Sequence, residues 1–103
     1  MYHSDEITDS ELLREFAEKA DAGTFEALVK HHGSMVHAAS MRVVANYHDA
    51  EDVTQAVFLA LAREAGKLSK RPSVAGWLHT VSHRLSLNAR KSRESRKRRE
   101  NLP

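Results

Sequence analysis

The stretch DAEDVTQAVFLALAREAG, from Asp49 to Gly66, has the pattern of a helix that is apolar almost all round. Asp49 starts the helix and Glu51 and Asp52 fall in its first turn, where the helix dipole favours negative charge, and Gly66 is a common stop signal. One broad arc of the helical wheel should lie in a core, and it holds Val53, Val57, Phe58, Ala60 and Leu61. This stretch therefore predicts a helix packed inside a helical domain.

The other arc of the same helix is mixed in character. It combines a central leucine, small alanines and a few polar groups, namely Asp52, Gln55, Ala56, Leu59, Ala62 and Arg63. These residues follow one another at spacings of three and four, so they share one face. Their composition is more typical of a protein-binding surface than of a solvated face. The alternative, that Leu59 packs on a neighbouring helix, stays open at this point.

Three other segments have helical patterns. Asp9 or Ser10 is expected to cap the first, which ends near Gly23, Thr24 is expected to cap the second, and the last starts near Ser73. We expect a turn over residues 46–48 and a basic loop over residues 67–72. The chain is predicted to be all-α, a compact bundle of about four helices over residues 9–93. Residues 1–8 are expected to form a flexible N-terminus. Residues 94–103 should form a frayed or disordered basic tail, because they have no apolar face to bury.

The composition narrows the class of protein. At 103 residues the chain is long enough for one core. It has no cysteine, so disulfides and thiolate zinc sites are excluded. No apolar run is long enough to span a bilayer, and the first residues are acidic where a signal peptide would be basic. We therefore expect a cytoplasmic protein.

Charge is divided unevenly along the chain. Residues 1–61 carry 11 Asp and Glu against 4 Lys and Arg, whereas residues 62–103 carry 12 Lys and Arg against 3 Glu. The C-terminal part is therefore suited to a polyanion.

The only tryptophan lies in this basic part, in SVAGWLHTVSHRLSLNARKSRESRKRRE, residues 73–100. The predicted core stripe is Val74, Leu78, Val81 and Leu85, and the predicted solvated side is His79, His83, Ser86, Arg90 and Arg93. Between them runs a row that we call the basic ridge: Trp77, Thr80, Arg84, Asn88 and Lys91. Cations meet phosphates, amides bond base edges and an indole stacks on an unpaired base, so this row suits nucleic acid. The preceding loop adds Lys67, Ser69, Lys70, Arg71 and Ser73.

Other functions fit some of the same residues. Trp77, the apolar stripe and the cations would suit a helix that lies on an anionic membrane. Alternatively, Trp77 is a core residue, and the basic tail only makes the protein more soluble. A protein-interaction module is a third option. His79 and His83 have a metal-chelating spacing but lack a third ligand, and His32 fits a hydrogen-bonded, half-buried histidine. No phosphate loop or nucleophile motif occurs, so we expect no enzyme, cofactor or bound metal.

The two quoted stretches resemble the conserved second region of bacterial sigma factors of the extracytoplasmic-function (ECF) group. That region usually reads DAEDVxQEVF followed by WLxxIARNxxxDxxR, and the likeness covers residues 20–100. It implies a domain that docks on the clamp helices of the largest subunit of RNA polymerase and that recognises and melts the −10 promoter element. It also makes an anti-sigma factor a candidate partner.

The resemblance assigns these roles residue by residue. Docking on the polymerase falls on Asp52, Gln55, Ala56, Leu59, Ala62 and Arg63. Capture of the non-template strand, with a flipped base held in a loop pocket, falls on Lys67, Ser69, Lys70, Arg71, Ser73, Trp77, Thr80, Arg84, Asn88 and Lys91.

The sequence departs from the family pattern at three places. Ala56 stands where Glu is usual, His83 and Arg84 replace Arg-Asn, and Asn88 replaces Asp. The first change removes a charged contact to the clamp, and the others are expected to alter base preference. Because sigma factors continue into a helix-turn-helix domain, we expect residues 94–103 to begin the linker to it and the chain to be one domain of a longer factor.

Overall fold

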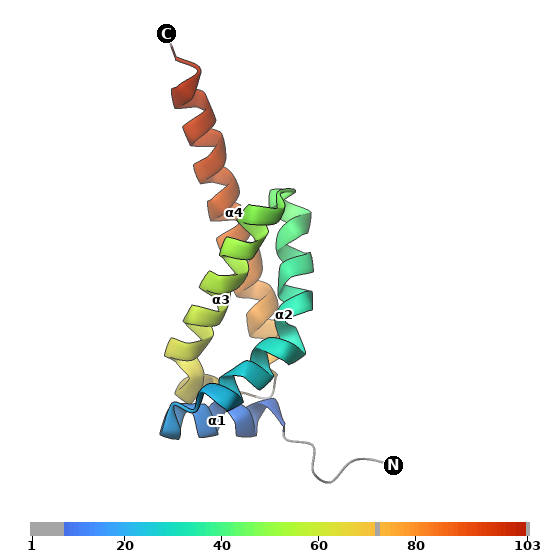
Figure 1. Ribbon diagram of the computed structural model, residues 1–103, viewed down its shortest axis with the longest axis vertical. Coiled ribbons are helices and arrows are strands. Elements are labelled where there is room, and N and C mark those ends of the chain that lie inside the picture. The colour runs from blue at the N-terminus through green and yellow to red at the C-terminus, as the bar shows by residue number, and fades with distance from the viewer. Residues whose placement is uncertain (1–7, 72, 103) are drawn as a thin grey trace.

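The computed structural model describes residues 8–71 and 73–102, and helices make up almost all of this part of the chain (Figure 1). In chain order they are α1 (Asp9–Lys19), α2 (Ala22–Val44), α3 (Tyr47–Leu68) and α4 (Val74–Glu100). The predictions of an all-α fold and of four helices are confirmed. Of the N-terminus expected to be flexible only Thr8 is described, and Pro72 also lies outside the described residues.

The first helix begins one residue earlier than predicted, because Thr8 caps it rather than Asp9 or Ser10. The Glu11 N–H donates to the Thr8 hydroxyl at 3.1 Å, and the Thr8 N–H donates to the Glu11 carboxylate at 3.0 Å. This reciprocal pair is a capping box. The hydrogen bonds from the Thr8 backbone and side chain hold the pKa of Glu11 below its ordinary value.

The next two helices also begin earlier than predicted. Asp21 rather than Thr24 caps α2, and Asn46 rather than Asp49 caps α3, accepting from the Asp49 N–H at 2.9 Å. More than one residue near each start can cap a helix, Asp21 and Thr24 for α2 and Asn46 and Asp49 for α3, and a sequence pattern does not show which of them takes the extended backbone of a cap. The turn expected over residues 46–48 is therefore limited to residues 45–46.

Two alanines and a buried leucine set where the helices end. Ala20 and Ala45 close α1 and α2 in the left-handed conformation, each with φ of 52°. Gly66 was wrongly predicted to end α3, which continues to Leu68 because that side chain is buried in the core. Lys67 therefore lies in the last turn of α3, and the loop between α3 and α4 is shorter than expected.

The two central helices, α2 and α3, each contact every other helix. They run side by side, α1 crosses one end of the pair, and α4 packs along both (Figure 1). The predicted core residues of α3 are buried except for Ala60, which is partly exposed. In α4 the predicted stripe is confirmed for Val74, Leu78 and Val81, while Leu85 is half-buried.

Among the described residues three serines are fully buried, and one of them corrects a prediction. Ser40 of α2 and Ser82 of α4 donate their hydroxyls to carbonyls of their own helices, at 2.9 and 2.6 Å. Ser86 was predicted to face solvent but is also fully buried, one turn beyond Ser82. The polarity of a serine does not show whether it is exposed, because its small side chain can also be buried where neighbouring helices approach closely.

The end of α4 also differs from expectation. Residues 94–100 were predicted to be frayed or disordered, yet α4 is helical to Glu100 and extends past the rest of the bundle (Figure 1). Arg93, predicted to face solvent, forms an ion pair with Asp49 at 2.9 Å and ties this part of α4 to the start of α3. The protruding helix gives the molecule its length of 62 Å.

The left-handed alanines give a stability test. Ala45→Gly should raise the free energy of unfolding by about 0.5–1 kcal/mol, because glycine relieves steric strain at positive φ. Ala39→Gly, in the interior of α2, should lower it by about 1 kcal/mol. Urea denaturation followed by circular dichroism measures both. Equal losses in the two variants would mean that Ala45 is not strained.

Candidate functional site

The mixed arc of α3 lies on the surface, as a protein-binding face must. Asp52, Gln55, Leu59 and Arg63 are exposed, whereas Ala56 and Ala62 are half-buried. Leu59 is 61% exposed. The alternative that it packs on a neighbouring helix is therefore wrong. We call this set of six residues the α3 face.

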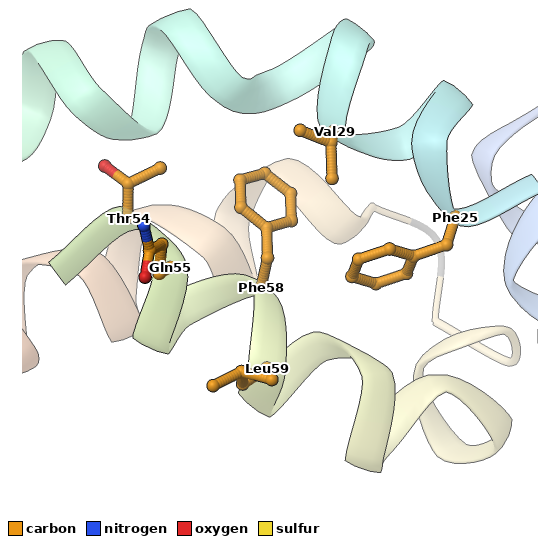
Figure 2. Close-up of a pocket in the computed structure, with 6 residues that line it drawn as sticks. All are labelled: Phe25, Val29, Thr54, Gln55, Phe58 and Leu59. Atoms are coloured by element: carbon orange, nitrogen blue, oxygen red, sulfur yellow. The ribbon is translucent and has the colours of Figure 1, made fainter. Parts of the chain in front are cut away.

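An apolar groove of about 350 Å³ adjoins the α3 face. Its lining comes from both central helices and consists of Phe25, Val29, Thr54, Gln55, Phe58 and Leu59. Figure 2 shows Phe25 and Val29 extending from α2 toward Phe58, with Leu59 next to Phe58 on α3 but pointing away from α2. The rings of Phe25 and Phe58 meet edge to face with centroids 6.3 Å apart. Phe25 and Val29 were not predicted as site residues, because only the packing of α2 on α3 brings them to Leu59.

The basic ridge follows one side of α4. Trp77 is half-buried at its first turn, and Thr80, Arg84, Asn88 and Lys91 are exposed. The Thr80 hydroxyl donates to the carbonyl of Gly76 at 3.1 Å. Trp77 also packs against the core cluster, so it is both a packing residue and part of the surface.

Part of the loop joins the ridge around a surface pocket of about 530 Å³, which we call the basic pocket. Its lining consists of Arg71, Ser73, Gly76, Trp77, Thr80, Val81 and Arg84. Five of the ten residues predicted for nucleic-acid binding therefore meet in one place. Gly76 was not predicted as a site residue, although a glycine in the first turn of a helix is a feature of the sequence that could have drawn attention to it.

The other predicted nucleic-acid residues lie outside the lining of this pocket. Lys67 and Lys70 are exposed, and the Ser69 hydroxyl donates to the Gly66 carbonyl at 2.8 Å at the end of α3. Asn88 and Lys91 extend the ridge along α4 beyond the pocket.

Three histidines that the sequence singled out can be placed in the structure. His32 is half-buried and its Nε2 lies 2.8 Å from Asp9 Oδ2, which confirms the predicted hydrogen-bonded histidine. His79 and His83 are exposed. Within residues 8–71 and 73–102 no three His, Cys, Asp or Glu side chains are grouped to hold a metal ion.

The packing of α4 argues against the membrane-surface alternative. That alternative needs a free apolar face, but Val74, Leu78 and Val81 are buried in the bundle. Among the described helices, none combines the length and hydropathy that crossing a bilayer requires.

Comparison with known proteins decides the family. The model of the family described as Sigma-70 region 2 matches residues 28–96, which include the α3 face, the basic pocket and the basic ridge. The chain belongs to the sigma-70 region 2 family. Part of the resemblance in the sequence is thereby confirmed, because the chain has the second region of a sigma factor.

The curated relatives of this sigma-70 region 2 chain are named as ECF factors. It is 32% identical over 100 residues to the ECF RNA polymerase sigma factor SigE of Mycolicibacterium smegmatis, covering 97% of this chain and 38% of the relative. It is 34% identical over 90 residues to the ECF RNA polymerase sigma factor SigK of Mycobacterium sp. strain KMS, covering 86% of this chain and 46% of the relative. The chain thus spans less than half the length of either relative. No solved structure matches it significantly.

The exposure of Leu59 gives a test of the α3 face in this sigma-70 region 2 domain. Leu59→Ala should change the free energy of unfolding by less than about 0.5 kcal/mol, because the side chain lies mostly in water. Leu61→Ala, two residues on and fully buried, should cost about 2–5 kcal/mol. Thermal and urea unfolding distinguish the two, and a large loss in Leu59→Ala would place that residue in the core after all.

Proposed function

We propose that the chain is the sigma factor domain that docks on the clamp helices of RNA polymerase and recognises and melts the −10 promoter element in transcription initiation. Sigma factors are not enzymes, and such a domain acts by binding alone. The observation that carries the proposal is the pairing, within the matched region, of the mixed α3 face, with its exposed Leu59, and the basic pocket and ridge of α4. A factor with this role works beside polymerase and DNA, so we assign it to the cytoplasm.

The α3 face is proposed to meet the polymerase. Covering Leu59 would remove most of an exposed leucine from water, a gain of about 1–2 kcal/mol. Gln55 and Arg63 flank it and offer directional hydrogen bonds, and the groove beside it can receive an apolar side chain of the partner. An anti-sigma factor covering this face would block docking, so inhibition by such a partner is compatible with the proposal.

The basic pocket and ridge are proposed to hold the non-template strand. Arg71 and Arg84 can neutralise phosphates or bond a base edge, and Trp77 can stack on an unpaired base for about 1–3 kcal/mol. A base leaves the duplex at a cost of a few kcal/mol, which these contacts would offset. The positive C-terminal part would also draw the strand toward the site.

Docking is tested with a purified clamp-helix fragment of the largest RNA polymerase subunit. Gln55→Ala and Leu59→Glu should each weaken binding, the second by about tenfold or more, because it buries a charge in place of an apolar side chain. Leu102→Glu is the matched control, since Leu102 is 70% exposed and lies beyond the end of α4. Titration calorimetry on variants shown to be folded gives the affinities. No binding by the wild type, or equal loss in all three variants, contradicts the docking role.

Strand capture is tested with a single-stranded oligonucleotide and the same sequence as duplex. The domain should prefer the single strand, and its affinity should fall steeply with salt. Arg84→Ala should reduce the slope of log K against log salt by about 0.7, the value for one phosphate contact on a single strand. Arg14→Ala is the control, because Arg14 lies on α1 among Glu11, Glu15 and Glu18. Salt-insensitive binding without strand preference would instead support a protein-interaction module.

A further inference from the structure

Gly76 lies in the first turn of α4 without a structural need for glycine. Its φ is not in the left-handed region, so its backbone conformation is open to any residue. A Cβ built on it would meet nothing within 4 Å. Glycine lowers the stability of a helix relative to alanine, so the fold alone favours alanine at this position.

The position of Gly76 offers another reason for glycine. It lines the basic pocket between Ser73 and Trp77, with Arg71 and Arg84 in the same lining. Its carbonyl accepts the Thr80 hydroxyl, so that hydroxyl is held along the helix. Any side chain at position 76 would therefore occupy open space at the pocket wall, beside the indole.

We propose that Gly76 is a specificity-determining residue, whose missing side chain leaves room in the basic pocket for the ring of one unpaired nucleobase. This rests on the proposed function, in which the pocket holds a base of the non-template strand. The helix gives up some stability at Gly76, and the pocket gains space next to Trp77 and Arg84. Backbone phosphates can be met by Arg84 and by exposed cations outside the pocket, such as Lys70 and Lys91, and these contacts do not need the space beside Gly76.

The test compares Gly76→Ala with the wild type on two 12-nucleotide probes, oligo-dT and an abasic strand of the same length. The wild type should bind oligo-dT roughly tenfold more tightly than the abasic strand, because only the former supplies a base to stack. In Gly76→Ala this ratio should fall close to one while binding to the abasic strand stays unchanged. Fluorescence anisotropy of labelled strands gives the four affinities.

The matched control is Gly33→Ala in the interior of α2. A Cβ there would lie 3.8 Å from Val29 Cγ1, an ordinary contact, and Gly33 is not part of the basic pocket. Both variants should melt about 2–8 °C higher than the wild type, because alanine favours helix. Only Gly76→Ala should lose the preference for oligo-dT.

The outcomes distinguish the role of Gly76 from base capture by the basic pocket. A Gly76→Ala variant that keeps the full preference for oligo-dT overturns the role of Gly76 and leaves strand capture standing. A wild type that binds both probes equally contradicts base capture itself, and the role of Gly76 with it. An equal loss of preference in Gly33→Ala would show that the effect does not come from the pocket.

Discussion

Burial of one arc of α3 is the constraint on which the other parts of the structure depend. Val57 and Leu61 are completely inaccessible to solvent, and α1, α2 and α4 all pack against the helix that carries them. Once this arc is fixed in the core, the rotation of α3 about its own axis is fixed as well. The opposite arc, with Leu59 at its centre, is then held outward on a rigid element.

The same constraint acts on α4. Its stripe of Val74, Leu78 and Val81 is held against α2 and α3, which sets the direction of the neighbouring row of side chains. Trp77 lies between the two, in contact with the core and in the lining of the basic pocket. This position accounts for a tryptophan at the start of the basic segment. The buried part of the ring anchors α4 in the core, and the uncovered part of the ring belongs to the surface.

Much of this arrangement follows from periodicity. The exposed and buried arcs of α3, apart from Ala60, and the surface position of the basic ridge were predicted correctly, because side chains at spacings of three and four share a face in any helix. Errors arose where one residue type has two uses. Ser86 was placed on the solvated side of the last helix but is fully buried, since a serine can also fill a narrow space between helices. Gly66 was taken as a stop signal, although burial of Leu68 keeps the helix intact past it.

Other features depend on tertiary structure and have no local signal. The apolar groove needs Phe25 and Val29 of α2 beside Leu59 of α3, and a sequence pattern gives no such pairing. The basic pocket also combines loop and helix residues, but Arg71 and Trp77 are close in the chain, and five of the seven lining residues were predicted from the sequence. The docking and strand-binding roles of individual residues stay predictions.

The short loop between α3 and α4 has a consequence for how the two surfaces act together. Residues 69–73 connect a helix carrying the proposed docking face to a helix carrying the proposed strand site, and five residues span at most about 18 Å. Arg71 and Ser73 of the basic pocket belong to this connection, so the pocket begins within one short loop of the helix that carries the proposed docking face. A partner on α3 and a strand in the pocket would therefore be held near each other by one bundle, and their separation would be limited by the length of the loop.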